Sequence, residues 1–206
     1  GGKLKKMTDM KKGLIFVLFA LVSIVSYSQI SWNAKVGMNM SNFTGDMDTD
    51  MKIGFNVGVG MEYQFSDMWS IQPSLMISQK GGKYDEDGET VKFNPMYLEI
   101  PVLAAARFAV TDNQNVVVKA GPYFAFGVAG KVKVGDEKGD FFGDGDDQYG
   151  GKRFDCGIGV GVAYEIGKFF VGLDGEFGFT NVVDFKSDNV SNPKNMNFSI
   201  GVGYKF

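Results

Sequence analysis

The chain has 206 residues, and its 21 basic and 24 acidic residues give a formal net charge of −3, which offers no electrostatic basis for binding nucleic acid. It contains no histidine and a single cysteine, so a Ser-His-Asp triad, the common zinc sites and an intrachain disulfide are all excluded. The 29 glycines and 19 phenylalanines beside only 5 prolines are typical of a folded domain, and no enzymatic site, cofactor or metal is expected.

The first predicted element in chain order is an export signal. A basic stretch that includes Lys12 is followed by the apolar run Leu14–Val25 and by a Ser-Tyr-Ser segment that ends at Ser28. This order is typical of a cleavable secretory signal peptide. It assigns residues 1–28 to the signal and upstream residues, and residues 29–206 to one domain. A retained transmembrane helix is the alternative, but the apolar run falls well short of the roughly 20 residues that span a bilayer.

Eight segments then alternate large apolar residues with polar or small ones. They cover residues 31–41, 53–65, 69–80, 92–109, 116–131, 153–166, 169–180 and 196–206. In the last segment, the large apolar side chains from Phe198 to Phe206 share one face, and polar or small residues share the other. An apolar face toward lipid and a polar face toward a lumen are typical of a transmembrane barrel. The predicted fold class is therefore all-β, an eight-stranded antiparallel up-and-down transmembrane β-barrel.

The connections between these segments alternate in length. Short connections are expected at 66–68, 111–115 and 167–168, and long ones at 42–52, 81–91, 132–152 and 181–195. Outer-membrane barrels show this asymmetry, with the short turns in the periplasm, and an even strand number places both ends of the barrel on that side. Pro73, Pro101 and Pro122 interrupt predicted strands, and we expect bulges or weak pairing there because proline cannot donate to the ladder.

The alternation also assigns charged residues of both signs to the lumen. These inward positions are Lys35, Glu62, Lys80, Glu99, Arg107, Lys119, Lys131, Arg153, Asp155, Glu165, Asp174, Glu176 and Lys205. An eight-stranded barrel is just wide enough inside for side chains to fill it. Because a buried unpaired charge is costly, we expect these groups to pair into a structural plug. A conducting pore is the alternative.

Three of the long loops are rich in acidic residues. Asp46, Asp48 and Asp50 have the spacing that opens a calcium-binding loop, but Met51 and Val57 occupy the positions that need glycine and glutamate. No metal site is therefore assigned, although loose divalent-ion binding by residues 139–147 stays open beside a solvated loop. The aromatic residues of the third acidic loop are candidate contact residues, which either pack onto the barrel rim or bind a partner. They are Phe141, Phe142 and Tyr149.

Four motifs carry a resemblance to a known family. They are Tyr97–Leu103 (YLEIPVL), Gly121–Tyr123 (GPY), the glycine-alternating strand Gly157–Gly161 and the terminal Gly201–Phe206. In this order they resemble the small outer-membrane β-barrel proteins of the porin family or PorT-like type. The resemblance implies an eight-stranded barrel in a Gram-negative outer membrane. It also implies that Tyr204 and Phe206 form the signal that the barrel-assembly machinery recognises.

The leading functional hypothesis is a monomeric, non-enzymatic outer-membrane barrel with a plugged lumen. Its role would be structural, or it would contact a surface partner through its long acidic loops, with outer-membrane lipid and the barrel-assembly machinery as its other partners. A porin for a small solute or ion is one alternative, and an accessory component of a protein-secretion apparatus is another. A soluble lipocalin-like carrier is a third alternative, and it predicts apolar residues inside and polar residues outside.

Overall fold

The computed structural model describes residues 29–44, 50–86, 89–135, 137–142, 148–183 and 192–206. The predicted signal peptide, residues 1–28, lies outside the described residues and stays a prediction. In the described ranges, no helix is long and apolar enough to cross a bilayer.

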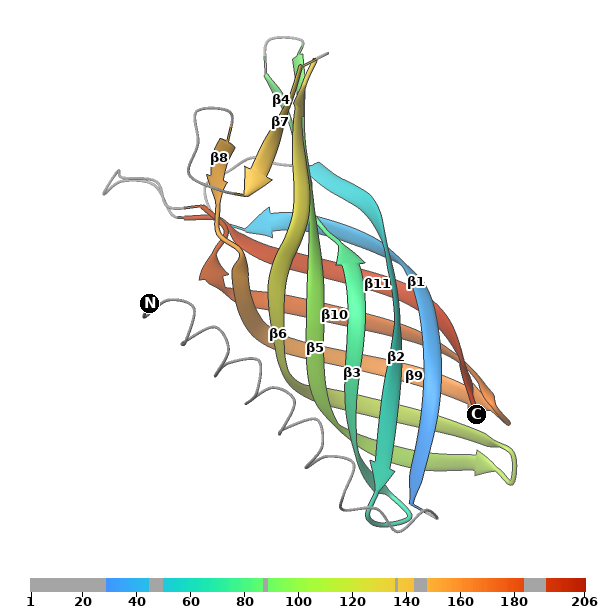
Figure 1. The fold of residues 1–206 in the computed structure, drawn as a ribbon. Helices are drawn as coiled ribbons and strands as arrows, with labels where there is room; N and C mark the ends of the chain where they lie inside the picture. Colours follow the sequence, from blue (N-terminus) through green and yellow to red (C-terminus); the bar gives the residue numbers. More distant parts are fainter. Residues whose placement is uncertain (1–28, 45–49, 87–88, 136, 143–147, 184–191) are drawn as a thin grey trace, which may run out of the picture. The chain divides into compact units, whose positions relative to one another are not determined.

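Eight long antiparallel strands form a closed ring. Their bounds are β1 Ile30–Thr44, β2 Asp50–Gln64, β3 Trp69–Gln79, β5 Glu89–Thr111, β6 Gln114–Val134, β9 Phe154–Ile166, β10 Phe169–Asn181 and β11 Lys194–Lys205. The ring closes where the first strand pairs with the last, in a register that runs from Asn33↔Lys205 to Thr44↔Lys194. Figure 1 shows the two strands side by side, blue and red, and all eight strands tilted in the barrel wall. The predicted all-β barrel is confirmed.

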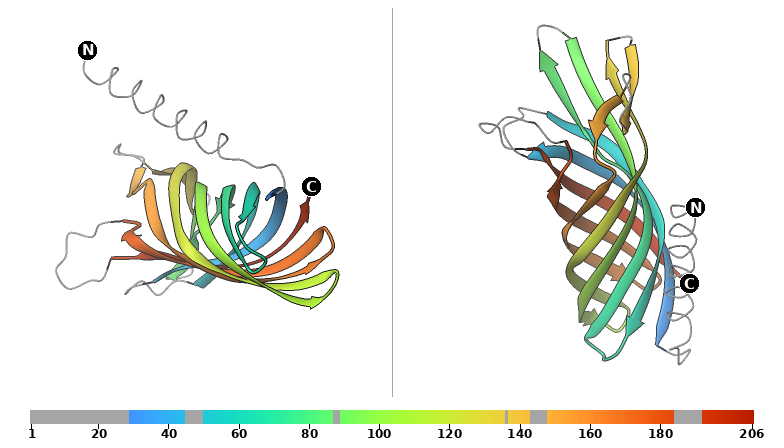
Figure 2. Two further views of the ribbon diagram at one scale, coloured as in Figure 1. Left: turned by 90° about the horizontal axis from the view of Figure 1, so that it is seen from below. Right: turned by 60° about the vertical axis from the view of Figure 1, so that its left-hand side comes forward.

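Three short strands extend the sheet at the end that carries the long connections. They are β4 Gly82–Glu86, β7 Glu137–Phe142 and β8 Gln148–Gly151. β4 pairs with β2 and β5, β7 pairs with β6, and β8 pairs with β7 in parallel. Together with the ends of β5 and β6 they make a sheet that protrudes beyond the ring (Figure 2). The expectation of plain loops at 81–91 and 132–152 is therefore wrong, because apolar residues such as Val132 and Phe141 are buried there.

Tight turns connect the strands at the opposite end of the barrel. They lie at residues 65–68, 112–113 and 167–168. Gly167 has φ 59° in the last of them, a left-handed conformation that glycine adopts without strain. The predicted alternation of short and long connections is therefore present, with all three short turns at one end.

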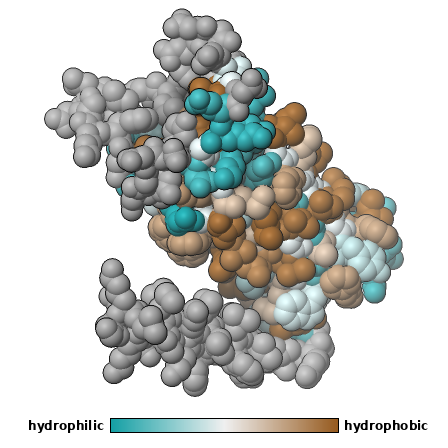
Figure 3. Space-filling model, turned by 45° about the horizontal axis from the view of Figure 1, so that its top comes forward, coloured by the Kyte–Doolittle hydropathy of each residue, from teal (hydrophilic) through white to brown (hydrophobic). Residues whose placement is uncertain are grey.

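The barrel is apolar outside and polar inside. Exposed outward side chains include Val57, Phe124, Val160, Leu173 and Ile200, whereas their inward neighbours include buried Asn39, Glu62 and Ser199. On the face in view, Figure 3 shows apolar side chains over the wall and hydrophilic residues toward the end with the protruding strands. This arrangement is the reverse of a lipocalin-like carrier, which would be polar outside.

The prolines weaken the pairing locally but do not shift it. The pairing passes from Pro73↔Val102 to Met76↔Glu99 and from Pro101↔Tyr123 to Ala104↔Ala120 in one unbroken register. The register shifts of β5 and β6 fall elsewhere, at Met96/Tyr97 and Ala109/Thr111. Of the two outcomes expected at the prolines, weak pairing is the one observed, and no bulge occurs there. Two neighbouring residue pairs are skipped at each site, so the missing amide donor is absorbed without an extra residue.

A depth-dependent cost is expected for charges on the apolar belt. Leu173 is 56% exposed on the belt, five residues into β10, whereas Val110 lies next to the turn at 112–113. Leu173→Arg should lower the free energy of unfolding by about 2–4 kcal/mol, and Val110→Arg by about 0–1 kcal/mol, because the charge of the second variant reaches the interface. Reversible denaturant unfolding in lipid vesicles measures both values. Equal losses in the two variants would contradict a lipid-facing belt.

Candidate functional site: the barrel interior

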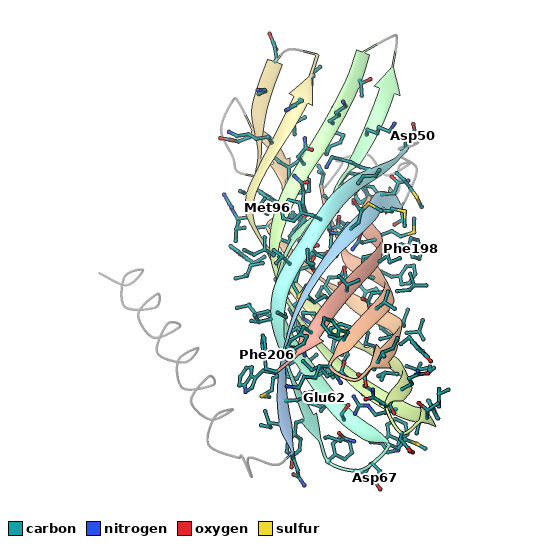
Figure 4. All side chains as sticks on the ribbon, turned by 90° about the vertical axis from the view of Figure 1, so that its right-hand side faces the viewer. Asp50, Glu62, Asp67, Met96, Phe198 and Phe206 are labelled. Atoms are coloured by element: carbon teal, nitrogen blue, oxygen red, sulfur yellow. The ribbon has the colours of Figure 1, made fainter. Side chains whose placement is uncertain are left out.

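The densest group of charges lies in the barrel near the short turns. This Glu62 cluster consists of Glu62, Arg107, Glu165 and Lys205. Arg107 donates to both carboxylates at 2.9–3.1 Å, and Lys205 lies 2.9 Å from Glu62 and 2.5 Å from Glu165. Ser70 adds a third type of donor, at 2.8 Å from Glu62. Figure 4 shows Glu62 toward the end of β2 that leads to Asp67, with Asp50 at the other end. With two carboxylates and two cations, the formal charges in this cluster sum to zero.

A second group occupies the middle of the barrel. Asp174 on β10 pairs with Lys35 of β1 and, at 2.9 Å, with Lys119 of β6. The three strands are not sequence neighbours, so ring closure brings these side chains together. One carboxylate here serves two lysines.

A third group lies toward the long connections and contains a fully buried lysine. Lys80 is 1% exposed, and its amino group lies 2.5 Å from Glu99 and 2.9 Å from Glu176. The same amino group lies 4.6 Å from the ring centroid of Tyr123 and 5.9 Å from that of Tyr97, within the range of a cation–π interaction. We call Lys80, Glu99 and Glu176 the Lys80 cluster.

Neutral hydrogen bonds surround the remaining carboxylate, Asp155. It accepts from the Tyr123 hydroxyl at 3.0 Å, from Thr180 at 2.5 Å and from the Asn195 amide at 2.8 Å. Asn39 makes a similar network on the opposite wall, where its amide donates to Ser78 at 2.9 Å. Buried polar groups with partners of this kind cost little.

A cavity of about 90 Å³ lies between the three charged groups. Residues of each charged group line it, including Glu62, Lys119 and Glu176, and its apolar wall includes Leu103 and Val117. Its volume has room for a few water molecules and not for a solute. In the described part of the chain, no group of three or more histidine, cysteine or acidic residues is arranged to hold a metal ion.

An aromatic cluster closes over the interior at the end with the long connections. The rings of Phe141 and Phe142 are 1% and 5% exposed, and their centroids lie 4.8 Å apart. Phe142 stacks edge to face on Tyr97 at 5.7 Å, and Phe141 on Phe93 at 6.1 Å. Phe43 from β1 joins the same cluster. Of the two roles expected for Phe141 and Phe142, packing onto the rim is the one observed, and a partner patch is wrong because the rings are buried.

Two of the residues assigned to the lumen lie outside it. Lys131 is 61% exposed and pairs with Asp140 of β7. The register shift at Met96/Tyr97 leaves Val128 as an extra residue in β6, and this bulge reverses the faces of the residues that follow. Arg153 precedes the first residue of β9, is exposed, and donates to the carbonyl of Gly127 at 2.9 Å. Its guanidinium lies over the ring of Phe142, 5.3 Å from the centroid, so it packs on the aromatic cluster and does not join the charged groups of the lumen.

The remaining candidates are Tyr204 and Phe206, at the end of the last strand, and Tyr149, in the protruding sheet. Tyr204 and Phe206 lie outside the ring, with the Tyr204 ring 5.0 Å from that of Phe169 and 5.8 Å from that of Phe206. The backbone amide of Phe206 donates to Trp32 at 2.9 Å. Tyr149 lies in β8, and its side chain is outside what the structure describes. Phe43 and Phe93 were not among the predicted site residues, and no local sequence signal marks them, because their partners lie on other strands.

The chain matches one protein family and is similar to several solved structures. The family described as outer membrane protein beta-barrel domain matches residues 23–184. Among solved structures, the attachment invasion locus protein Ail of Yersinia pestis is 16% identical (85% of this chain, 98% of that chain, TM-score 0.43). Neisserial surface protein A is 14% identical (85% and 97%, TM-score 0.45), and OprG of Pseudomonas aeruginosa is 10% identical (85% and 95%, TM-score 0.44). No curated protein matches the chain.

Proposed function

Because the chain belongs to the family of outer membrane proteins with a β-barrel domain, we propose that it is a non-enzymatic barrel with a plugged lumen that holds a surface-exposed sheet for contacts outside the cell. The protein lies in the outer membrane of a Gram-negative cell. The short turns at 65–68, 112–113 and 167–168 then face the periplasm, and the long connections face outward.

The observation that carries this proposal is the filling of the interior. The Glu62 cluster, the Asp174 group and the Lys80 cluster occupy successive levels of the barrel, and the rings of Phe141 and Phe142 lie beyond them. Passage of an ion would require these ion pairs, with distances of 2.5–3.0 Å, to separate. Their separation is costly because it leaves unpaired charges in a low-dielectric core. This favours a rigid support over a porin.

Planar-bilayer recording tests the closed lumen. Purified protein inserted into the bilayer should give a conductance indistinguishable from that of protein-free membrane, because paired charges fill the narrow lumen and leave a cavity of only about 90 Å³. A wide-lumen porin recorded in the same membranes controls for insertion. Reproducible single-channel steps from this protein would contradict the plug and favour the porin alternative.

The remaining parts of the proposal concern partners. The exposed apolar belt supports lipid as the surrounding partner, and Tyr204 and Phe206 are proposed as the signal for the barrel-assembly machinery. We also propose a monomer, since the ring closes on itself and leaves no unpaired edge in its wall. The protein mass in detergent solution, measured after subtraction of bound detergent, tests this proposal. A mass of twice that of the chain would contradict a monomer.

A further inference from the structure

Four lysines lie in one row across the protruding sheet. The strand register places Lys83 of β4 opposite Lys92 of β5, Lys92 opposite Lys133 of β6, and Lys133 opposite Lys138 of β7. We call these four residues the lysine row. Directly opposed residues on neighbouring strands have their Cβ atoms about 5 Å apart, and like charges in such positions destabilise a sheet.

The described side chains give the lysine row little internal compensation. Lys92, Lys133 and Lys138 are exposed, and among the described side chains none forms an ion pair with any of the four lysines. Asp50 borders the row opposite Lys83, and Asp140 is engaged by Lys131 in the adjacent row. The sheet therefore presents a line of four cations, about 15 Å long at the usual strand spacing, that an external line of anions would stabilise.

The lysine row points to the outer side of the sheet and continues the apolar belt. Phe93 and Val132, which alternate with Lys92 and Lys133, pack inward with the aromatic cluster. Below the row on β6, the outward side chains of Phe124, Phe126 and Val128 are each about half exposed. On β5, Lys92 precedes Met96 by four residues, roughly 13 Å along the strand, and Figure 4 shows Met96 in the upper part of the barrel.

We propose that the lysine row binds the phosphate groups of a phosphorylated glycolipid in the outer leaflet, whose acyl chains lie against the belt below. The continuity of cations with the exposed aromatic and aliphatic side chains favours a lipid over a soluble polyanion, which would need only the cations. This site adds to the proposed function a lipid partner that is bound by its headgroup and holds the protruding sheet at the membrane surface.

Charge reversal within the row separates binding from folding. In K133E, the new carboxylate lies between Lys92 and Lys138, so it should form opposite-charge cross-strand pairs and leave the barrel at least as stable as the wild type. The matched control is K168E, which reverses an exposed charge in the short turn at the other end. Purified proteins in neutral detergent are titrated with lipid A that carries two phosphates, and binding is followed by the rise in the thermal unfolding midpoint.

The wild type and K168E should bind this lipid equally, and K133E at least about five-fold more weakly. A phosphate-free lipid A analogue should bind the wild type as weakly as the phosphorylated lipid binds K133E. Equal binding by K133E and the wild type, or equal binding of the two lipids, would overturn the site. Dextran sulfate that binds the wild type while lipid A does not would assign the row to a soluble polyanion. None of these readouts depends on conductance, so the site and the plug fail separately.

Discussion

Glu62→Ala is expected to lower the free energy of unfolding by about 3–5 kcal/mol, which is the usual cost of removing one partner from a buried ion-pair network. The Glu62 side chain is 4% exposed and accepts from Arg107 and Lys205. Without it, two cations share the single carboxylate of Glu165. Equilibrium denaturant unfolding in lipid vesicles, followed by tryptophan fluorescence, measures the loss.

The control for this variant removes one partner of an ion pair that is exposed to solvent. Lys131 and Asp140 are 61% and 53% exposed, so Lys131→Ala should cost about 0–1 kcal/mol. Glu62→Gln retains a hydrogen-bond acceptor for the two cations and should fall between the two alanine variants. A Glu62→Ala loss no larger than that of the control would mean that water fills this part of the barrel and screens the cluster.

Lys80→Met should produce a loss of similar size, about 3–5 kcal/mol, for the opposite reason. Methionine keeps the length of the side chain, but Glu99 and Glu176 then face each other without the cation that lies 2.5 Å and 2.9 Å from them. Glu99 is 2% exposed. The same unfolding experiment measures the effect.

A triple variant distinguishes charge imbalance from lost packing. In K80M/E99Q/E176Q all three charges are removed while the side-chain volumes are nearly kept, and such replacements are often neutral or stabilising. We therefore expect the triple variant to regain at least half of the stability that Lys80→Met loses. If the triple variant were less stable than the single one, the contribution of Lys80 would come from packing against Tyr97 and Tyr123.

Local alternation of residue types was sufficient to predict the barrel wall. Each of the eight predicted segments lies within three residues of an observed strand at both ends, as for 169–180 and Phe169–Asn181. The inward positions Glu62, Glu99, Asp155 and Asp174 follow from the same alternation. Side-chain direction has a period of two along any strand, and lipid on one side and a narrow lumen on the other impose opposite polarities on the two faces.

The tertiary structure decided everything that depends on which strands are neighbours. One extra residue at Val128 turned Lys131 from the lumen to the surface. Burial of Phe141 and Phe142 required partners from β1 and β5, far away in the sequence. The sequence marks the long connections by their acidic residues. The lysine row, by contrast, forms only because the pairing of four strands aligns lysines that are distant in the sequence. Alternation therefore determines the face of each residue within a strand, whereas bulges and strand pairing, which arise from contacts distant in sequence, determine what each face meets.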